Sequence, residues 1–242
     1  MAAKRKRKRK VRKSSRRPFR KALKLVALTL LAAVALSIMM VLPLRWFNPV
    51  TTAFMLQDDS GREPLLHEWV SWTDVGTAMP LAAVAAEDQR FAVHFGVDWH
   101  SIRKSLDEAG DGSRLRGAST ISQQLAKNLF LTPSRSFVRK GIEAYMSVVI
   151  EVFLPKRRIL EIYVNVVELG PGIYGVGAAS RYYFHKMPHD LSDRQAALLA
   201  ATLPNPIQLK VDAPSAYLRE RQTWIVSQMQ RLRNEDWLYH LR

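Results

Sequence analysis

Cysteine is missing from this chain of 242 residues, which excludes disulfide bonds and metal sites with cysteine ligands. Acidic residues are missing from residues 1–24, which hold 14 lysines and arginines. The rest of the chain holds 23 basic and 21 acidic residues, so most of the net charge of +16 belongs to the N-terminal tail. Internal repeats and alternating strand patterns are scarce as well. The composition therefore favours a mainly helical domain behind a basic tail.

A run of 18 residues without a charge, LVALTLLAAVALSIMMVL, follows the tail at residues 25–42. As a helix it would be about 27 Å long, close to the thickness of a bilayer core. Lys24 and Arg45 flank the run, and Trp46 and Phe47 suit a membrane interface. The run is too long for a cleaved signal peptide, and the residues after it make a poor cleavage site. We therefore expect an uncleaved signal anchor.

The positive tail sets the expected topology. Residues 1–24 should stay in the cytoplasm and contact anionic lipid. Residues 25–44 would be the single transmembrane segment in the cytoplasmic (inner) membrane. Residues 45–242 would then form an extracytoplasmic, periplasmic domain. A buried soluble helix is the alternative, but the flanking charges do not supply the core that it would need.

Helical periodicity dominates the body of the chain. Ile121, Leu125 and Leu129 repeat every four residues and form one apolar stripe. Ser192 and Gln195 have the spacing of a capping box. We expect helices at about residues 80–88, 117–131, 139–154, 156–169, 196–203 and 217–232, with a glycine-rich break at 170–184.

Two carboxylates end the apolar run PLAAVAAED at residues 80–88. Glu87 follows side chains without hydrogen-bonding groups, so we expect it to be partly desolvated, with a pKa raised toward that of a general base. Asp88 points about 100° further round a helix and need not share that environment. The two acids could therefore take different roles. The alternative is a helix end with solvated acids that pair with Arg90.

A second group of charges lies further along the chain. Lys127, Arg135, Arg139 and Lys140 form a basic cluster that could bind a phosphate or diphosphate, although a solvated basic face would have the same pattern. Glu143 follows Arg139 by four residues, which an ordinary surface ion pair explains equally well.

Two polar patterns leave structural alternatives open. The segment GAST at residues 117–120 precedes a helix and could present backbone N–H groups to an anion, or could simply cap the helix. Glu161, Asn165 and Glu168 form a polar stripe, which is more typical of a solvated or structural face than of a site.

Five segments carry a resemblance to a known family. EDQRFAVHFGVD at 87–98 is similar to the motif E-D-x-x-F-x-x-H-x-G, and GASTISQQLAKNLFL at 117–131 to G-[AG]-S-T-I-[ST]-Q-Q-x-x-K-N. RKGIEAYMSVVIE at 139–151 keeps R-K-x-x-E, and residues 156–184 resemble two further motifs. Together and in this order, they resemble the peptidoglycan glycosyltransferases of glycosyltransferase family 51.

The resemblance implies a mainly α fold with a lysozyme-like helical lobe, a small membrane-proximal jaw lobe and a long cleft, preceded by one N-terminal transmembrane helix. The donor would be a growing glycan on undecaprenyl diphosphate, and the acceptor would be lipid II. A β-1,4 link would form with inversion and release of undecaprenyl diphosphate. The chain ends too soon for the transpeptidase domain of longer relatives, so a monofunctional enzyme is expected.

The resemblance also implies roles for individual residues. Glu87 matches the general base that takes the proton of the acceptor 4-hydroxyl, and Lys127 and Arg135 match the positions that stabilise the diphosphate. Glu143 matches a second catalytic acid, and it stays open whether this acid orients the cations or helps to hold a divalent metal such as Mg²⁺ or Mn²⁺. The implied substrate-binding residues are Asp88, Arg90, Phe91, His94, Gly117, Ser119, Thr120, Gln123, Gln124, Lys127, Asn128, Arg135, Arg139 and Lys140.

The sequence requires no cofactor. The expected partners are lipid II, the lipid-linked glycan chain and membrane lipids, with cell-division or elongation proteins as further candidates. Nucleic acid is a poor fit, because the tail adjoins a membrane span and the body is nearly neutral. Two other functions stay open. One is a lysozyme-like lytic enzyme on finished peptidoglycan, which would not need Lys127 and Arg135, and the other is a non-catalytic, membrane-anchored cell-wall scaffold.

Overall fold

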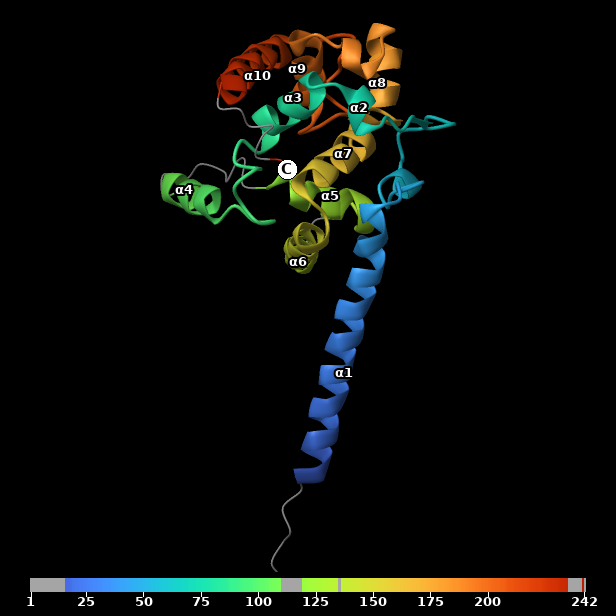
Figure 1. Ribbon diagram of the computed structural model, residues 1–242, viewed down its shortest axis with the longest axis vertical. Coiled ribbons are helices and arrows are strands. Elements are labelled where there is room, and N and C mark those ends of the chain that lie inside the picture. The colour runs from blue at the N-terminus through green and yellow to red at the C-terminus, as the bar shows by residue number, and fades with distance from the viewer. Residues whose placement is uncertain (1–15, 110–118, 135, 235–240, 242) are drawn as a thin grey trace, which may run out of the picture. The chain divides into compact units, whose positions relative to one another are not determined.

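The computed structural model describes residues 16–109, 119–134, 136–234 and 241 (Figure 1). The chain divides into two compact units, residues 1–40 and 41–242. The α-helices are α1 (Arg16–Val41), α2 (Trp72–Val75), α3 (Ala78–Glu87), α4 (Trp99–Ala109), α5 (Ile121–Phe130), α6 (Phe137–Phe153), α7 (Lys156–Val166), α8 (Gly175–Phe184), α9 (Asp193–Thr202) and α10 (Ala216–Asn234). Short 3₁₀ helices are η1 (Leu42–Arg45), η2 (Met55–Gln57) and η3 (Pro188–Asp190), and the strands are β1 (Leu66–His67), β2 (Glu168–Gly170) and β3 (Ile173–Tyr174).

Over residues 25–41, helix α1 carries no charged residue and is largely apolar on all sides. Leu25, Leu28, Leu31 and Met39 are each more than half exposed. An exposed helix that is apolar on all sides suits lipid better than water. Among the described residues, this segment is the one helix long and apolar enough to cross a membrane. It is therefore compatible with the predicted single-pass anchor.

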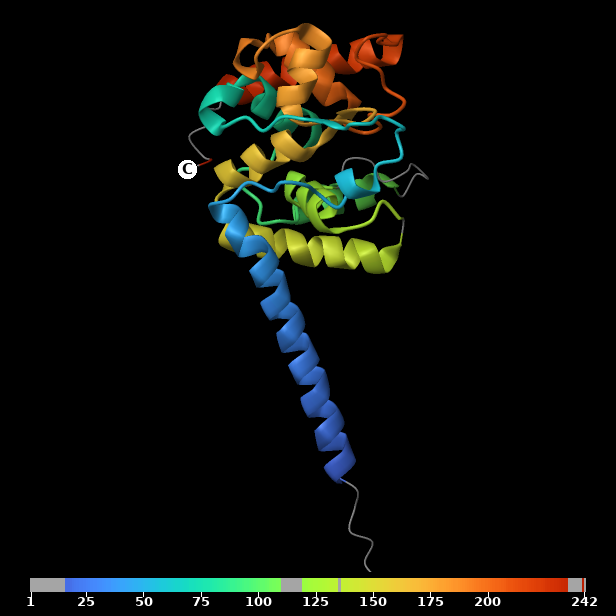
Figure 2. The ribbon, with the colours of Figure 1, turned by 90° about the vertical axis from the view of Figure 1, so that its right-hand side faces the viewer.

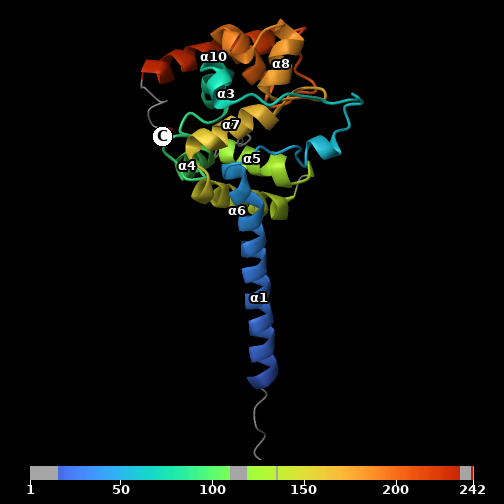
Figure 3. The same ribbon diagram turned by 45° about the vertical axis from the view of Figure 1, so that its right-hand side comes forward.

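The helices of residues 41–242 form two groups that α7 joins. Helices α3, α9 and α10 pack on one another, whereas α5 packs on α6. Helix α7 contacts α3 and α8 as well as α5 and α6. Figures 2 and 3 show α7 between the two groups. This arrangement confirms the predicted mainly α fold and places the end of α3 close to α5.

A small three-stranded sheet borders α8, with the strand order β1–β3–β2. Strand β1 is parallel to β3, with Leu66 opposite Ile173, and β2 is antiparallel to β3. The predicted glycine-rich break at 170–184 is wrong over most of its length, because α8 begins at Gly175. Gly177 lies so close to the Glu68 carbonyl oxygen that a Cβ would collide with it. The glycines there allow close packing rather than a loop.

The polar stripe on α7 is structural. The Asn165 side chain is buried, accepts a hydrogen bond from the Val70 N–H at 2.8 Å and donates to the Val70 carbonyl at 2.9 Å. Glu161 accepts from the Trp72 N–H at 3.1 Å and pairs with Arg158. These contacts tie the segment before α2 to α7, so neither residue belongs to a solvated face.

Helix α3 lies in the core. Its residues from Ala78 to Ala85 are all buried, and most of their side chains are alanine, valine or leucine. Small side chains let α9 and α10 approach this helix closely. The core therefore holds α3 rigidly and brings its last residue, Glu87, to the edge of the apolar interior.

Candidate active site

Glu87 ends α3 with little access to water: its side chain is 14% exposed. The Gln124 Nε2 atom donates a hydrogen bond to Glu87 Oε2 at 2.8 Å, and Arg221 Nη2 contacts Oε1 at 3.0 Å. Burial raises the pKa of Glu87, and the charge of Asp88 adds to the rise, whereas Gln124, Arg221 and Lys127 oppose it. The predicted desolvation of this acid is confirmed. The alternative partner, Arg90, is wrong, because the cation at Glu87 is Arg221.

Asp88 is also buried, but its carboxylate accepts hydrogen bonds from other groups of the protein. Oδ2 accepts hydrogen bonds from the Ile121 N–H at 2.9 Å and from His94 Nε2 at 2.8 Å. The Ile121 N–H belongs to the first turn of α5, where a negative charge is favoured by the helix dipole. The anion expected at this helix N-terminus is thus supplied by Asp88 itself. Glu87 and Asp88 therefore have different environments, and the Asp88 carboxylate links the end of α3 to the start of α5.

Thr120 and Gln123 complete the start of α5 as a capping box. The Gln123 N–H donates to Thr120 Oγ1 at 3.1 Å, and the Thr120 N–H donates to Gln123 Oε1 at 3.1 Å. Thr120 Oγ1 also donates to the Gly96 carbonyl at 2.5 Å. Thr120 therefore caps α5, and the anion at the first turn of this helix is the Asp88 carboxylate of the same protein.

Four residues expected to bind substrate lie in the interior instead. Phe91 is fully buried beneath Lys156, whose Nζ lies 4.5 Å from the ring centroid, and His94 is bound to Asp88. Gln123 and Asn128 are buried on α5. These side chains lack access to a bound molecule, which corrects the expectation of direct contact. They support the residues that do face the pockets.

One pocket, here called the cation pocket, holds most of the predicted positive charges. Its volume is about 270 Å³, and its lining residues are Glu87, Ser119, Gln124, Lys127, Arg139, Lys140, Glu143, Leu203 and Pro204. Lys127 comes from α5, while Arg139 and Lys140 come from the first turn of α6. The structure thus brings together cations from two helices beside Glu87.

Glu143 organises two of these cations. It is buried, and its Oε2 accepts from Arg139 Nη1 at 2.7 Å while its Oε1 pairs with Lys140 Nζ. Lys140 Nζ also donates to Ser119 Oγ at 2.9 Å. The i,i+4 pair expected from spacing is present but is not an ordinary surface pair, since Glu143 is screened from water.

Among the described residues, Lys127 forms no ion pair with a carboxylate. Its Nζ lies 5.0 Å from the centroid of the Phe54 ring, a cation–π contact. Burial lowers its pKa, with Arg139 and Lys140 adding to the effect and Glu143 and Glu87 opposing it. A partly desolvated ammonium group among other cations favours binding of an anion.

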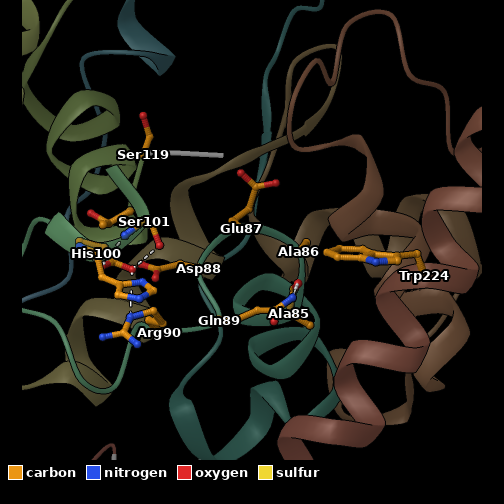
Figure 4. A pocket seen from close by; sticks show the side chains of 12 residues that line it. Ala85, Ala86, Glu87, Asp88, Gln89, Arg90, His100, Ser101, Ser119 and Trp224 are labelled. Atoms are coloured by element: carbon orange, nitrogen blue, oxygen red, sulfur yellow. Dashed lines mark hydrogen bonds and ion pairs between the residues drawn. The ribbon is translucent and has the colours of Figure 1, made fainter. Parts of the chain in front are cut away.

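The second pocket, here called the α3 pocket, shares Glu87 and Ser119 with the cation pocket. It has a volume of about 330 Å³ and is lined by Ala85, Ala86, Glu87, Asp88, Gln89, Arg90, Asp98, His100, Ser101, Ser119, Thr120 and Trp224. Figure 4 shows Glu87 between Trp224 on one side and the group around His100 and Ser101 on the other. Arg90 pairs with Asp98 at 3.3 Å, so this pocket carries much less free positive charge than the cation pocket.

Glu87 and Ser119 line both pockets, so they mark the junction. A carboxylate with a raised pKa can accept a proton from a hydroxyl group in one pocket. Cations in the adjoining pocket can stabilise negative charge on a departing group. The arrangement is suited to a displacement in which a hydroxyl replaces an anionic leaving group.

Sequence reasoning missed three residues around Glu87. Arg221 and Trp224 belong to α10, and Tyr163 on α7 donates to Gln124 Oε1 at 2.8 Å. Nothing in their local sequence marks them, because each reaches the site only through packing of distant helices. Gly117 and Arg135, both expected to bind substrate, lie outside the described residues.

Two observations bear on the metal-binding role that the resemblance implies for Glu143. Within residues 16–109, 119–134 and 136–234, no group of three or more histidine and acidic side chains is placed to hold an ion. Both carboxylate oxygens of Glu143 are engaged by cations. The described contacts therefore favour the orienting role over the metal-binding role for this acid.

Comparison with known proteins identifies the family. Residues 56–230 match the family described as transglycosylase. A biosynthetic peptidoglycan transglycosylase of Shewanella amazonensis is 48% identical over 209 residues, with 84% of each chain covered. Proteins of the same name from Shewanella frigidimarina and Stutzerimonas stutzeri are 52% identical (78% of this chain and 82% of the relative) and 45% identical (88% and 90%). The chain therefore belongs to the transglycosylase family of enzymes.

Proposed function

We propose that the protein is a peptidoglycan transglycosylase that polymerises lipid II into β-1,4 glycan strands and releases undecaprenyl diphosphate. The observation that carries this proposal is the position of Glu87 between the α3 pocket and the cation pocket. The names of the relatives support the substrate class. In this assignment the acceptor hydroxyl lies on the α3-pocket side of Glu87, and the donor diphosphate lies among the cations.

Glu87 acts as the general base. As the acceptor 4-oxygen attacks the anomeric carbon of the donor, its proton passes to the Glu87 carboxylate, and a new C–O bond forms. The bond from the anomeric carbon to the diphosphate oxygen breaks, and its electron pair leaves with undecaprenyl diphosphate. Because burial raises the pKa of Glu87, the carboxylate is a better proton acceptor than an exposed glutamate.

The departing diphosphate is stabilised by Lys127, Arg139 and Lys140. Electrostatic stabilisation of developing charge is commonly the largest contribution in such reactions. Glu143 holds Arg139 and Lys140 in place, and its own charge is already matched by theirs. Lys127 forms no ion pair within the described part of the chain, so its positive charge is not neutralised by a bound carboxylate and is available to the diphosphate. Arg135 is expected to join them.

The pocket arrangement also fits inversion at the anomeric carbon. A single displacement needs the acceptor and the leaving group on opposite faces of the donor sugar. The two pockets adjoin at Glu87 and Ser119, and in the proposed reaction the acceptor and the leaving group occupy different pockets. An α-linked diphosphate would then give a β-linked product.

The proposed location is the outer face of the cytoplasmic membrane, with the basic tail inside and α1 as the anchor. Lipid II would be drawn from the bilayer. Helix α6 supports this location, because it carries a row of exposed apolar side chains: Phe137, Val138, Ile142, Val148 and Val152. Soluble proteins seldom expose such rows without a partner surface. A reporter that works only in the cytoplasm should be active when fused to the N-terminus and inactive at the C-terminus.

The test of the proposed function is direct. The purified full-length protein, reconstituted in detergent or lipid, should convert lipid II into glycan polymer and should not clear cell-wall sacculi. Clearing of sacculi without polymer would favour the lytic alternative. A Glu87→Gln variant that behaves like wild type in every measurement would favour a scaffold. Absence of polymer from the folded wild-type protein would overturn the proposal.

A further inference from the structure

Tyr163 is a large buried side chain whose polar end is aimed at the site. It lies on α7 and is fully buried. Its hydroxyl donates a hydrogen bond to Gln124 Oε1 at 2.8 Å. The opposite end of the same amide, Gln124 Nε2, donates to Glu87 Oε2 at 2.8 Å. These two consecutive hydrogen bonds connect α7, α5 and the end of α3.

The orientation of the Gln124 amide between Tyr163 and Glu87 matters for the chemistry. A glutamine amide has an oxygen that only accepts and a nitrogen that only donates, and the two ends can exchange places by a rotation. An ionised Glu87 can only accept, so the nitrogen must face it. With the oxygen turned toward Glu87, the charged carboxylate would meet another acceptor, and its protonated form would be favoured instead.

We propose that Tyr163 is a positioning residue for the reaction: its hydroxyl holds the Gln124 amide with the nitrogen toward Glu87, which keeps the carboxylate aligned and ionised. This inference rests on the proposed function of Glu87 as the base. Tyr163 does not line either pocket, so it acts through Gln124 and not by touching the substrate.

The surroundings of Tyr163 make it a dependable donor. Burial raises its pKa well above the ordinary value, and the negative charges of Glu87 and Asp88 raise it further. The hydroxyl therefore stays protonated at any working pH. Within the described part of the chain, Gln124 is the one hydrogen-bond partner of this hydroxyl. A phenylalanine at this place would remove the donor without emptying the core.

Other charged groups around Glu87 stay in place when this hydroxyl is removed. Arg221 approaches from α10, Lys127 from α5 and Asp88 from the next position in the chain. Helix α6 contributes three further charges across the cation pocket, Arg139, Lys140 and Glu143. Helix α9 is followed by Leu203 and Pro204, which carry no charge. A change in the titration of Glu87 would then report on the Gln124 contact.

The experiment compares Tyr163→Phe with Tyr174→Phe in the full-length enzyme. Tyr174 is a matched control, because it is also buried and its hydroxyl donates to a carboxylate, Asp58, at 2.6 Å. For Tyr163→Phe we expect kcat for lipid II polymerisation to fall about tenfold, the usual worth of one buried hydrogen bond, with little change in KM. The acidic limb of the kcat–pH profile should move to higher pH. For Tyr174→Phe we expect both to stay unchanged.

A double-variant cycle tests whether Tyr163 acts through Gln124. Gln124→Ala should lower kcat and move the acidic limb in the same direction. Adding Tyr163→Phe to Gln124→Ala should then cause no further loss, because the connection is already broken. Two independent losses that multiply would overturn the inference. So would a lower melting temperature for Tyr163→Phe with an unmoved acidic limb, since that result assigns the hydroxyl to stability alone.

The outcome can be told apart from a failure of the proposed function. If wild-type enzyme forms no glycan polymer, the role of Glu87 fails before Tyr163 is considered. If wild type polymerises lipid II, Glu87→Gln abolishes the activity and Tyr163→Phe matches wild type at every pH, only the inference about Tyr163 fails.

Discussion

The two pockets that meet at Glu87 differ in how their charges are used. In the α3 pocket, Arg90 is already paired with Asp98, and Asp88 is taken up by α5 and His94. In the cation pocket, Glu143 pairs with Arg139 and Lys140, and no ion pair of Lys127 is present among the described residues, so positive charge is left over. One side is therefore suited to a neutral group and the other to an anion.

The two glutamates show the same contrast. Both carboxylate oxygens of Glu143 form ion pairs, one with Arg139 and one with Lys140. Glu87 has an amide and one arginine, and burial prevails over them to raise its pKa. Burial alone thus does not define a catalytic base, because what matters is burial that partners leave only partly compensated. The predictions below test this contrast, from the largest expected effect to the smallest.

Glu87→Gln should give the largest loss. The amide keeps the size of the side chain but cannot take a proton, so turnover of lipid II should fall at least about 100-fold. Binding of lipid II, measured by direct titration, should change far less. Glu68→Gln serves as the control, because Glu68 pairs with Arg181 away from both pockets and should retain activity. Equal losses in binding and turnover would contradict the assignment of Glu87 as a base.

Lys127→Ala should lower both turnover and affinity for a diphosphate. Removing one group that stabilises developing charge typically costs about 100-fold or more in turnover. Undecaprenyl diphosphate, used as a competing product, should bind much more weakly to this variant but normally to Glu87→Gln. Lys127→Arg should restore part of the loss, and Lys186→Ala, an exposed lysine, should resemble wild type. If Glu87→Gln and Lys127→Ala had the same profile, the division between the pockets would be wrong.

Arg221→Ala should move the titration of Glu87. Arg221 favours the charged carboxylate, so its loss should raise the pKa of Glu87 further. The base is active when ionised, and activity is lost as the pH falls through its pKa. The acidic limb of the rate profile should therefore move to higher pH, with the largest loss of activity on that limb. Arg219→Ala, an exposed arginine on the same helix, should leave the limb in place. A shift to lower pH would refute this explanation.

Local patterns carried much of the prediction. The apolar run before Glu87 indicated a desolvated acid, and the low exposure of its side chain, 14%, confirms it. The capping box at Ser192 and Gln195 is present as expected. Arg221 could not be predicted, since it lies 134 residues from Glu87 in the chain and no periodicity joins them. Helix α8 was missed for a related reason, because Gly177 packs closely against Glu68 and Val70, a contact that only the folded chain reveals.

Motif positions also proved easier to predict than the direction of their side chains. Phe91, His94 and Gln123 fall in the segments that build the site, yet all three point into the protein. A motif residue can be needed for substrate contact or for support of a neighbour, and the spacing is the same in both cases. The difference appears only with burial and hydrogen-bond partners, as it does between Glu87 and Asp88.

Glu168 offers the finest test, because its burial should affect stability and leave catalysis alone. It lies in β2 outside both pockets. Burial raises its pKa to about 7, with Asp58 and Asp59 adding to the rise and the Gly172 N–H and Lys127 opposing it. The ordinary pKa of this acid is 4.5, so at pH values above 4.5 it is ionised in the unfolded chain while it is still protonated in the folded protein. The free energy of unfolding therefore falls as the pH rises from 4.5 through 7. Glu168→Gln should remove this dependence. Its melting temperature relative to wild type should rise from pH 5 to pH 8 by roughly 2–4 °C.

The control for that measurement is Glu63→Gln, an exposed acid that should follow wild type at both pH values. Glu87 contributes a dependence of the same sign, because its pKa is raised too, but it is present in all three proteins and cancels in the comparison. Turnover of Glu168→Gln should match wild type near neutral pH. If the melting temperatures of Glu168→Gln and wild type kept the same difference at both pH values, the stability effect of Glu168 would be refuted. A loss of turnover without a change in stability would instead place Glu168 with Glu87 in the active site.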